Sequence, residues 1–89
     1  MAATYPLKIV SPDSIVYEAD VESLSVPGSE GSLGILAHHA PLLTTLAKGK
    51  IKVRENKTTL HQFQVDGGIL EVSGNGAVIL ADQIETSAK

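Results

Sequence analysis

The sequence predicts an all-β domain, a small antiparallel β-sandwich or flattened barrel of about ten short strands. Turn-forming residues recur at short intervals and leave little room for helices. The segments between them are rich in β-branched residues, and several alternate apolar and polar positions with period two. The turn signals are Ser11-Pro12-Asp13, Pro27-Gly28-Ser29, Lys48-Gly49, Glu55-Asn56-Lys57, Asp66-Gly67-Gly68 and Ser73-Gly74-Asn75-Gly76.

The clearest strand signal lies in residues 50–54. Ile51 and Val53 point to one face there, while three cations point to the other, which indicates a sheet with one wet face. Residues 60–66 repeat the alternation, with His61, Phe63 and Val65 on one face. Asn56-Lys57 lies between the two segments, so we expect a hairpin.

A second hairpin is expected near the end of the chain. Residues 69–72 and 77–80 are apolar and flank Asn75-Gly76, a pair that tolerates the positive φ of a type I′ turn. Residues 40–47 fit either one helical turn or a strand, and we favour a strand because the window is too short for a helical period.

Length and composition predict one domain and exclude several classes of protein. In 89 residues we place the sandwich at residues 1–82 and a short polar, frayed tail at residues 83–89. The chain has no cysteine, and no apolar run approaches the ~20 residues that span a bilayer, so we expect a soluble protein. Five of the seven basic residues lie within residues 48–57, but a net charge of −3 and few aromatics argue against nucleic acid.

No catalytic, cofactor or metal site is expected. His38-His39 suggests metal binding or acid–base chemistry, yet adjacent strand residues point to opposite faces and the companion ligands are missing. His61 belongs to an alternating apolar face, where a packed ring is ordinary. The carboxylates of the first third single out no pair, and neither a nucleophile elbow nor a phosphate loop occurs.

Residues 26–43 stand out because a glycine-rich turn leads into an apolar segment interrupted by Pro41. The turn Gly28-Ser29-Glu30-Gly31, the strand Leu33-Gly34-Ile35 and the segment His39-Ala40-Pro41-Leu42-Leu43 follow one another at a characteristic spacing. This region resembles the epsilon subunit family of F-type ATP synthases. Further matching segments are residues 7–12, 49–51, 67–72 and 78–82, so the resemblance extends from about Tyr5 to Asp82.

The resemblance implies a ten-stranded sandwich that is a non-catalytic part of the rotor, linking the gamma subunit to the c ring and coupling proton translocation to ATP synthesis. It implies no cofactor and a peripheral position on the cytoplasmic face of a bacterial membrane, with the chloroplast stromal face as the alternative. Relatives often continue into two helices that restrain hydrolysis, so little autoinhibition is expected of these 89 residues.

The same resemblance assigns two contact segments. The loop facing the c ring would hold Glu30, Gly31, Ser32 and Leu33, and the residues near gamma would be His39, Ala40, Pro41 and Leu42. Residues 35–43 should then leave apolar surface exposed for a partner, and a charge at Leu42 should weaken gamma binding if that side chain faces outward. Ser32 stands where relatives often carry a second acidic residue.

Two alternatives from other classes stay open. Biotinyl and lipoyl carrier domains are sandwiches of similar length with a modified lysine at a hairpin tip, where Lys57 lies. The flanking residues Asn56 and Thr58 do not match those domains. An enzyme built around His38 or His39 is the weaker alternative.

Overall fold

The computed structural model describes residues 3–86, and in this range the chain forms eight strands and no helix. An all-β fold is therefore confirmed, and no helix in the described range could cross a membrane. The strands are β1 (Tyr5–Val10), β2 (Ile15–Val21), β3 (Ser23–Gly28), β4 (Gly31–Leu36), β5 (Leu42–Arg54), β6 (Leu60–Ser73), β7 (Gly76–Ala81) and β8 (Ile84–Thr86).

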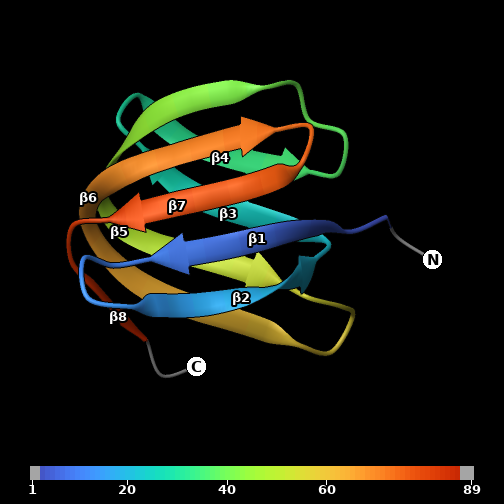
Figure 1. The fold of residues 1–89 in the computed structure, drawn as a ribbon, viewed down its shortest axis with the longest axis horizontal. Coiled ribbons are helices and arrows are strands. Elements are labelled where there is room, and N and C mark those ends of the chain that lie inside the picture. Colours follow the sequence, from blue (N-terminus) through green and yellow to red (C-terminus); the bar gives the residue numbers. More distant parts are fainter. Residues whose placement is uncertain (1–2, 87–89) are drawn as a thin grey trace.

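The sheet has fewer strands than predicted because two of them are long. β5 has 13 residues and β6 has 14, and they pair with each other over most of their lengths. Both curve strongly, so one sheet of order β2-β1-β7-β6-β5-β3-β4 folds over on itself into two layers (Figure 1). In β6 the bend falls at Gly67 and Gly68, which both have positive φ.

One strand pair departs from the antiparallel prediction. β1 and β7 run parallel, with Leu7 opposite Ala77 and Ile9 opposite Ile79, while the other pairs are antiparallel. The sheet is therefore mixed, because the first and seventh strands lie far apart in the sequence and need no hairpin between them.

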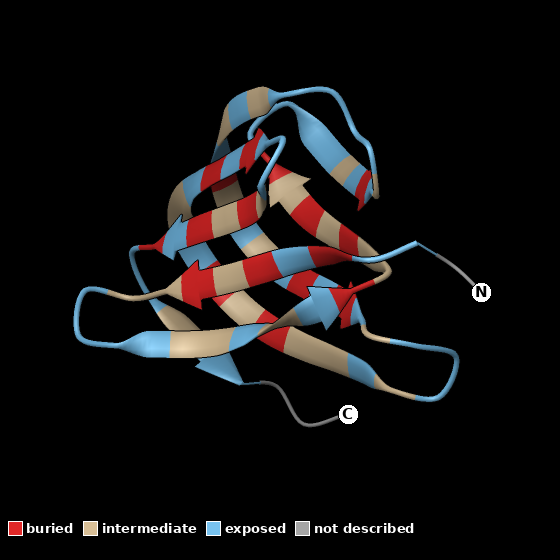
Figure 2. Cartoon of the chain, turned by 45° about the vertical axis from the view of Figure 1, so that its right-hand side comes forward, coloured by how far each residue is buried: buried red, intermediate tan, exposed pale blue. Residues whose placement is uncertain are grey.

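The core lies between the two layers and is almost entirely aliphatic. The alternation predicted for residues 50–54 is confirmed, because Ile51 and Val53 are fully buried while the three cations are exposed. Phe63 and Val65 are buried as predicted, and His61 is half-buried. Figure 2 shows the buried positions alternating along the strands on their inner faces, and no polar or charged side chain is fully buried in residues 3–86.

Both predicted hairpins form, but the second turn lies one residue earlier than expected. β5 and β6 are joined by residues 55–59, and Arg54 pairs with Leu60. β6 and β7 are joined by Gly74 and Asn75, because Ser73 pairs with Gly76. Of the three glycine or asparagine residues here only Gly76 has positive φ, at 127°, so the type I′ assignment to Asn75-Gly76 is wrong.

The tail contains a strand that the sequence did not indicate. Residues 84–86 form β8, which pairs with β6 through Phe63 opposite Thr86 and Val65 opposite Ile84. The Ile84 side chain packs against the core, which gives the strand an apolar anchor. The expectation of a frayed tail is therefore wrong for residues 84–86, and residues 87–89 lie outside the described range.

Segment 40–47 is a strand from Leu42 onward, in agreement with the prediction. Residues 37–41 form the connection between β4 and β5, and His38 there has a φ of 67°. His38 is the one residue other than glycine with positive φ among residues 3–86, a conformation that a side chain makes unfavourable. The loop therefore holds His38 and His39 away from the regular alternation of a strand.

Candidate functional site

An apolar row crosses the outer face of the layer formed by β2, β1, β7 and the second half of β6. Strand register places Ile15 opposite Val10, Val10 opposite Leu80, and Leu80 opposite Ile69. These strands lie side by side in Figure 1. Ile15, Leu80 and Ile69 are exposed by 55%, 51% and 41%, and Val10 is half-buried. We call these four residues the apolar row.

Polar groups border the apolar row. The neighbouring outward positions include Lys8, Glu18 and Glu71, and the Lys8 ammonium lies 3.9 Å from the Glu18 carboxylate. Leu43, on the neighbouring strand β5, is paired with Glu71 and is exposed by 71%. An apolar centre with a polar rim is the usual anatomy of a protein–protein contact. Scattered exposed leucines are ordinary, whereas a row across four strands makes this face a candidate docking surface.

The predicted loop of residues 30–33 lies beside this layer. Glu30, Gly31 and Ser32 are exposed, whereas Leu33 is half-buried and packs against the core. Ser29 ties the loop to β5, since its amide donates to the Thr45 carbonyl at 3.1 Å and the two hydroxyls are 2.6 Å apart. Thr45 pairs with Ile69, so the loop is fixed next to the end of the apolar row.

The predicted gamma-facing segment divides into exposed and inward-facing parts. His39, Ala40 and Pro41 are exposed in the β4–β5 connection, and the His39 ring Nδ1 is 2.7 Å from the Ala40 carbonyl. Leu42 is half-buried and packs against the core, so its side chain does not face fully outward.

Apolar surface is nevertheless exposed within residues 35–43, as predicted. Leu36 and Leu43 are exposed by 64% and 71%, while Ile35 is buried in the core. Leu36 is the last residue of β4 and Leu43 the second residue of β5, so they flank the connection that holds His38 and His39. Residues 3–86 contain no group of three histidine, cysteine, aspartate or glutamate side chains that could hold a metal ion.

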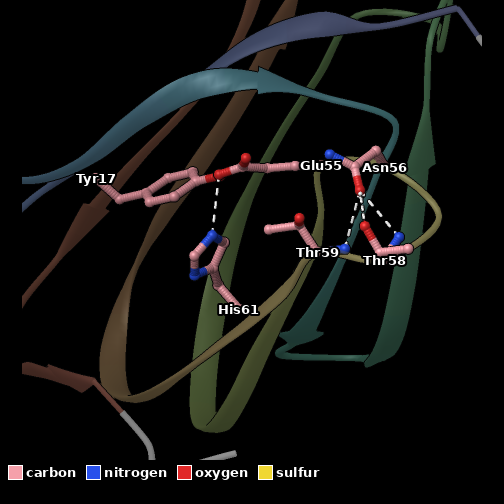
Figure 3. Close-up of polar contacts among 6 residues, drawn as sticks. All are labelled: Tyr17, Glu55, Asn56, Thr58, Thr59 and His61. Carbon is pink, nitrogen blue, oxygen red and sulfur yellow. Dashed lines mark hydrogen bonds and ion pairs between the residues drawn. The ribbon is translucent and has the colours of Figure 1, made fainter.

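A polar cluster that the sequence did not indicate joins β2 to the β5–β6 hairpin (Figure 3). One Glu55 carboxylate oxygen accepts hydrogen bonds from the Tyr17 hydroxyl and from His61 Nε2, the latter at 3.0 Å. The Tyr17 ring also packs against the His61 and Phe63 rings, with centroids 5.2 Å and 5.6 Å away. Burial and the bond to Glu55 raise the pKa of Tyr17. This cluster holds the edge strand β2 against the other layer.

Tyr5 makes a comparable link at the opposite end of the domain. Its hydroxyl donates to the Ile35 carbonyl at 2.7 Å, and its side chain belongs to the core. Burial raises the pKa of Tyr5 from 10.0 to about 12. Both tyrosine hydroxyls are therefore harder to ionise in the folded state than in the unfolded state.

Alkaline pH should destabilise the domain through these phenols. Because Tyr5 has a higher pKa folded than unfolded, its contribution is present below pH 10 and is lost as the pH rises toward 12. A shift of this size corresponds to about 2–3 kcal/mol in the free energy of unfolding. Urea unfolding at a series of alkaline pH values measures the loss. The Tyr5→Phe variant should show a shallower decline, and an unchanged decline would contradict the assignment.

The beta-sandwich domain model of the ATP synthase delta/epsilon chain matches residues 4–87, almost the whole chain. The chain belongs to this family. An ATP synthase epsilon chain from Caulobacter vibrioides is 38% identical over 80 residues, which are 90% of this chain and 92% of that relative.

Other members of the delta/epsilon family are longer than the matched region. The ATP synthase epsilon chain of Leptospira borgpetersenii is 45% identical over 76 residues, which cover 85% of this chain and 59% of that relative. The chain therefore spans little more than half the length of some curated relatives that it matches.

Two solved structures share the fold. A chain in the Euglena gracilis mitochondrial ATP synthase structure (OSCP/F1/c-ring) superposes with a TM-score of 0.88 at 23% identity, covering 97% of this chain and 55% of that one. A chain in the Tetrahymena thermophila central stalk/c-ring structure gives 0.78 at 21% identity, covering 94% and 67%. At such identities the likeness establishes the β-sandwich fold and nothing finer.

Membership of the delta/epsilon family replaces the carrier-domain and histidine-enzyme alternatives. Lys57 does lie in the loop of the β5–β6 hairpin, as the carrier alternative requires. However, the match extends over residues 4–87 and so accounts for all eight strands, whereas the carrier alternative rested on one lysine.

Proposed function

We propose that this chain is a non-catalytic central-stalk subunit of an F-type ATP synthase, which joins the gamma subunit to the c ring. The support is its membership of the delta/epsilon family, together with relatives that carry the name ATP synthase epsilon chain. The fold is also shared with chains in structures of an F1/c-ring assembly and of a central stalk with its c ring.

The apolar row is the observation that carries the proposal. Ile15, Val10, Leu80 and Ile69 place aliphatic surface on the outer face of one layer, where the domain's own core does not need it. An enzyme would keep its apolar groups inside a pocket, whereas a docking subunit presents them on a face. We assign this face to gamma, because a rotor contact under torque needs a broad and desolvated surface.

We also assign His39, Ala40 and Pro41 to the gamma contact. They are exposed and directly precede Leu42 and Leu43 at the start of β5. Leu42 anchors this segment to the domain, since its side chain packs against the core.

The c ring is assigned to the loop that begins at Glu30. Glu30, Gly31 and Ser32 are exposed and polar or small, as suits a contact with the polar loops of a membrane ring. Leu33 anchors this loop in the domain. The hydrogen bonds between Ser29 and Thr45 connect it to the strand that borders the apolar row.

The mechanism is mechanical. β5 carries Leu43 and Thr45, and it is paired with β6 along its length, so the two contact regions belong to one stiff unit. Force applied at the loop of residues 30–32 reaches the apolar row through ordered β-structure. In this way the subunit would couple proton flow at the c ring to rotation of gamma, on the cytoplasmic face of the membrane and without chemistry of its own.

Affinity capture from native membranes tests this assignment. The tagged 89-residue chain, added to membranes depleted of the resident subunit, should recover gamma and the c subunit together. Recovery of neither partner under conditions that preserve the rest of the rotor would contradict the proposal. The expectation that these 89 residues restrain ATP hydrolysis little stays a prediction, which hydrolysis assays on the same membranes can measure.

A further inference from the structure

The two asparagines of the chain lie in hairpin turns but differ in how their side chains are held. The Asn56 carboxamide oxygen accepts hydrogen bonds from the Thr58 amide at 2.9 Å, the Thr58 hydroxyl at 3.0 Å and the Thr59 amide at 3.0 Å (Figure 3). These bonds fix the Asn56 side chain over the turn between β5 and β6.

Asn75 has no comparable restraint. It is exposed in the two-residue turn between β6 and β7, and its backbone amide donates to the Ser73 hydroxyl at 3.2 Å. Within residues 3–86 the structure contains no hydrogen bond to the Asn75 carboxamide. The next residue is Gly76, which has no side chain to shield its backbone nitrogen.

We propose that Asn75 is a site of spontaneous deamidation and isomerisation, a property that goes beyond the proposed stalk function. The Gly76 backbone nitrogen loses its proton and attacks the Asn75 side-chain carbonyl carbon. The carbon–nitrogen bond of the carboxamide breaks, ammonia leaves, and a five-membered succinimide forms. Water then opens the ring at either carbonyl and gives aspartate or isoaspartate, with no oxidant or cofactor required.

Aspartate or isoaspartate at position 75 should disturb the packing and strand pairing around the β6–β7 turn. Gly76 packs closely on β1, because a Cβ built at Gly76 would lie 2.4 Å from the Pro6 carbonyl oxygen. Isoaspartate lengthens the main chain by one atom in a turn of only two residues, which strains the pairing of Ser73 with Gly76. Both products also add a carboxylate beside a shallow pocket of about 170 Å³ that Lys8 and Glu18 help to line.

Rates should differ strongly between the two asparagines. The three hydrogen bonds to the Asn56 carboxamide oxygen raise the barrier to reaction there, because the side chain must leave them before it can reach the next backbone nitrogen. Asn56 must break two or more of these three bonds before its side chain can rotate to react, whereas Asn75 need not, so Asn75 should react at least about tenfold faster than Asn56.

Ageing the folded 89-residue chain in mildly alkaline buffer tests the inference. Peptide mass mapping with an isoaspartate-specific methyltransferase should find conversion at Asn75 well ahead of Asn56. The aged wild-type protein should also melt at a lower temperature than an Asn75→Gln variant aged beside it. Conversion at equal rates, conversion first at Asn56, or reaction at Asn75 only after unfolding in denaturant would each overturn the proposal.

Discussion

Replacing Ile69 by aspartate is expected to weaken binding to the gamma subunit by roughly 30- to 1,000-fold, or about 2–4 kcal/mol. Ile69 lies in the apolar row and is 41% exposed in the free domain, so a partner would bury it completely. The introduced carboxylate would then be desolvated without a cation opposite it, which is costly. Titration of purified gamma against the variant domain measures the change.

Leu60→Asp is the matched control for this variant. Leu60 lies on the same strand, β6, and is 39% exposed, but it is paired with Arg54 on the outer face of the other layer. Both substitutions put aspartate at an outward strand position, so their effects on folding should be similar. Equal loss of gamma binding in the two variants, or none in Ile69→Asp, would contradict the assignment of the apolar row.

Gly68→Ala should destabilise the domain by about 3–5 kcal/mol. Gly68 has a φ of 144°, which a residue with a side chain rarely adopts, and it lies at the bend of β6. A Cβ there would lie 2.4 Å from the Leu80 carbonyl oxygen and 3.0 Å from the Ala81 Cα. Both atoms are backbone, so β7 would have to move away from β6. Thermal or urea unfolding measures the loss.

Gly74→Ala provides the control for that loss. Gly74 is exposed in the β6–β7 turn, and a Cβ there would meet no atom within 4 Å. Its φ lies outside the positive range, so alanine should be neutral or should stabilise the domain by up to about 1 kcal/mol. If the Gly68→Ala variant were as stable as the Gly74→Ala variant, the claim that β6 and β7 leave no room for a Cβ at Gly68 would be contradicted.

Local patterning was sufficient to predict an all-β fold, both hairpins and the inner faces of several strands, but not β8. Period-two alternation is a property of each strand by itself, so Ile51, Val53 and Phe63 could be placed inside without knowledge of their neighbours. The predicted hairpins followed in the same way, because a turn and its two strands are contiguous in sequence.

Features that depend on long-range pairing could not be predicted. The parallel pairing of β1 with β7 and the length of β5 and β6 both depend on how the sheet bends. The hydrogen bond between Tyr17 and Glu55 joins residues that are 38 positions apart in the sequence, and no local motif predicts it.

The apolar row was missed for the same reason. Ile15 and Leu80 belong to strands that pair with β1 on opposite sides, so their alignment exists only in the sheet. One signal was available, however. Residues 77–80 are apolar without interruption, and such a run in a strand with one wet face places an aliphatic side chain on the outside.

Restoration of proton-driven ATP synthesis tests the stalk function most directly. A synthase from the same source, depleted of its resident subunit and embedded in vesicles, would receive the 89-residue chain or its Ile69→Asp variant. The wild-type chain should restore ATP synthesis under an imposed proton gradient, and the variant should require a far higher concentration. Failure of the folded wild-type chain to restore synthesis at any concentration would contradict the assignment to the central stalk.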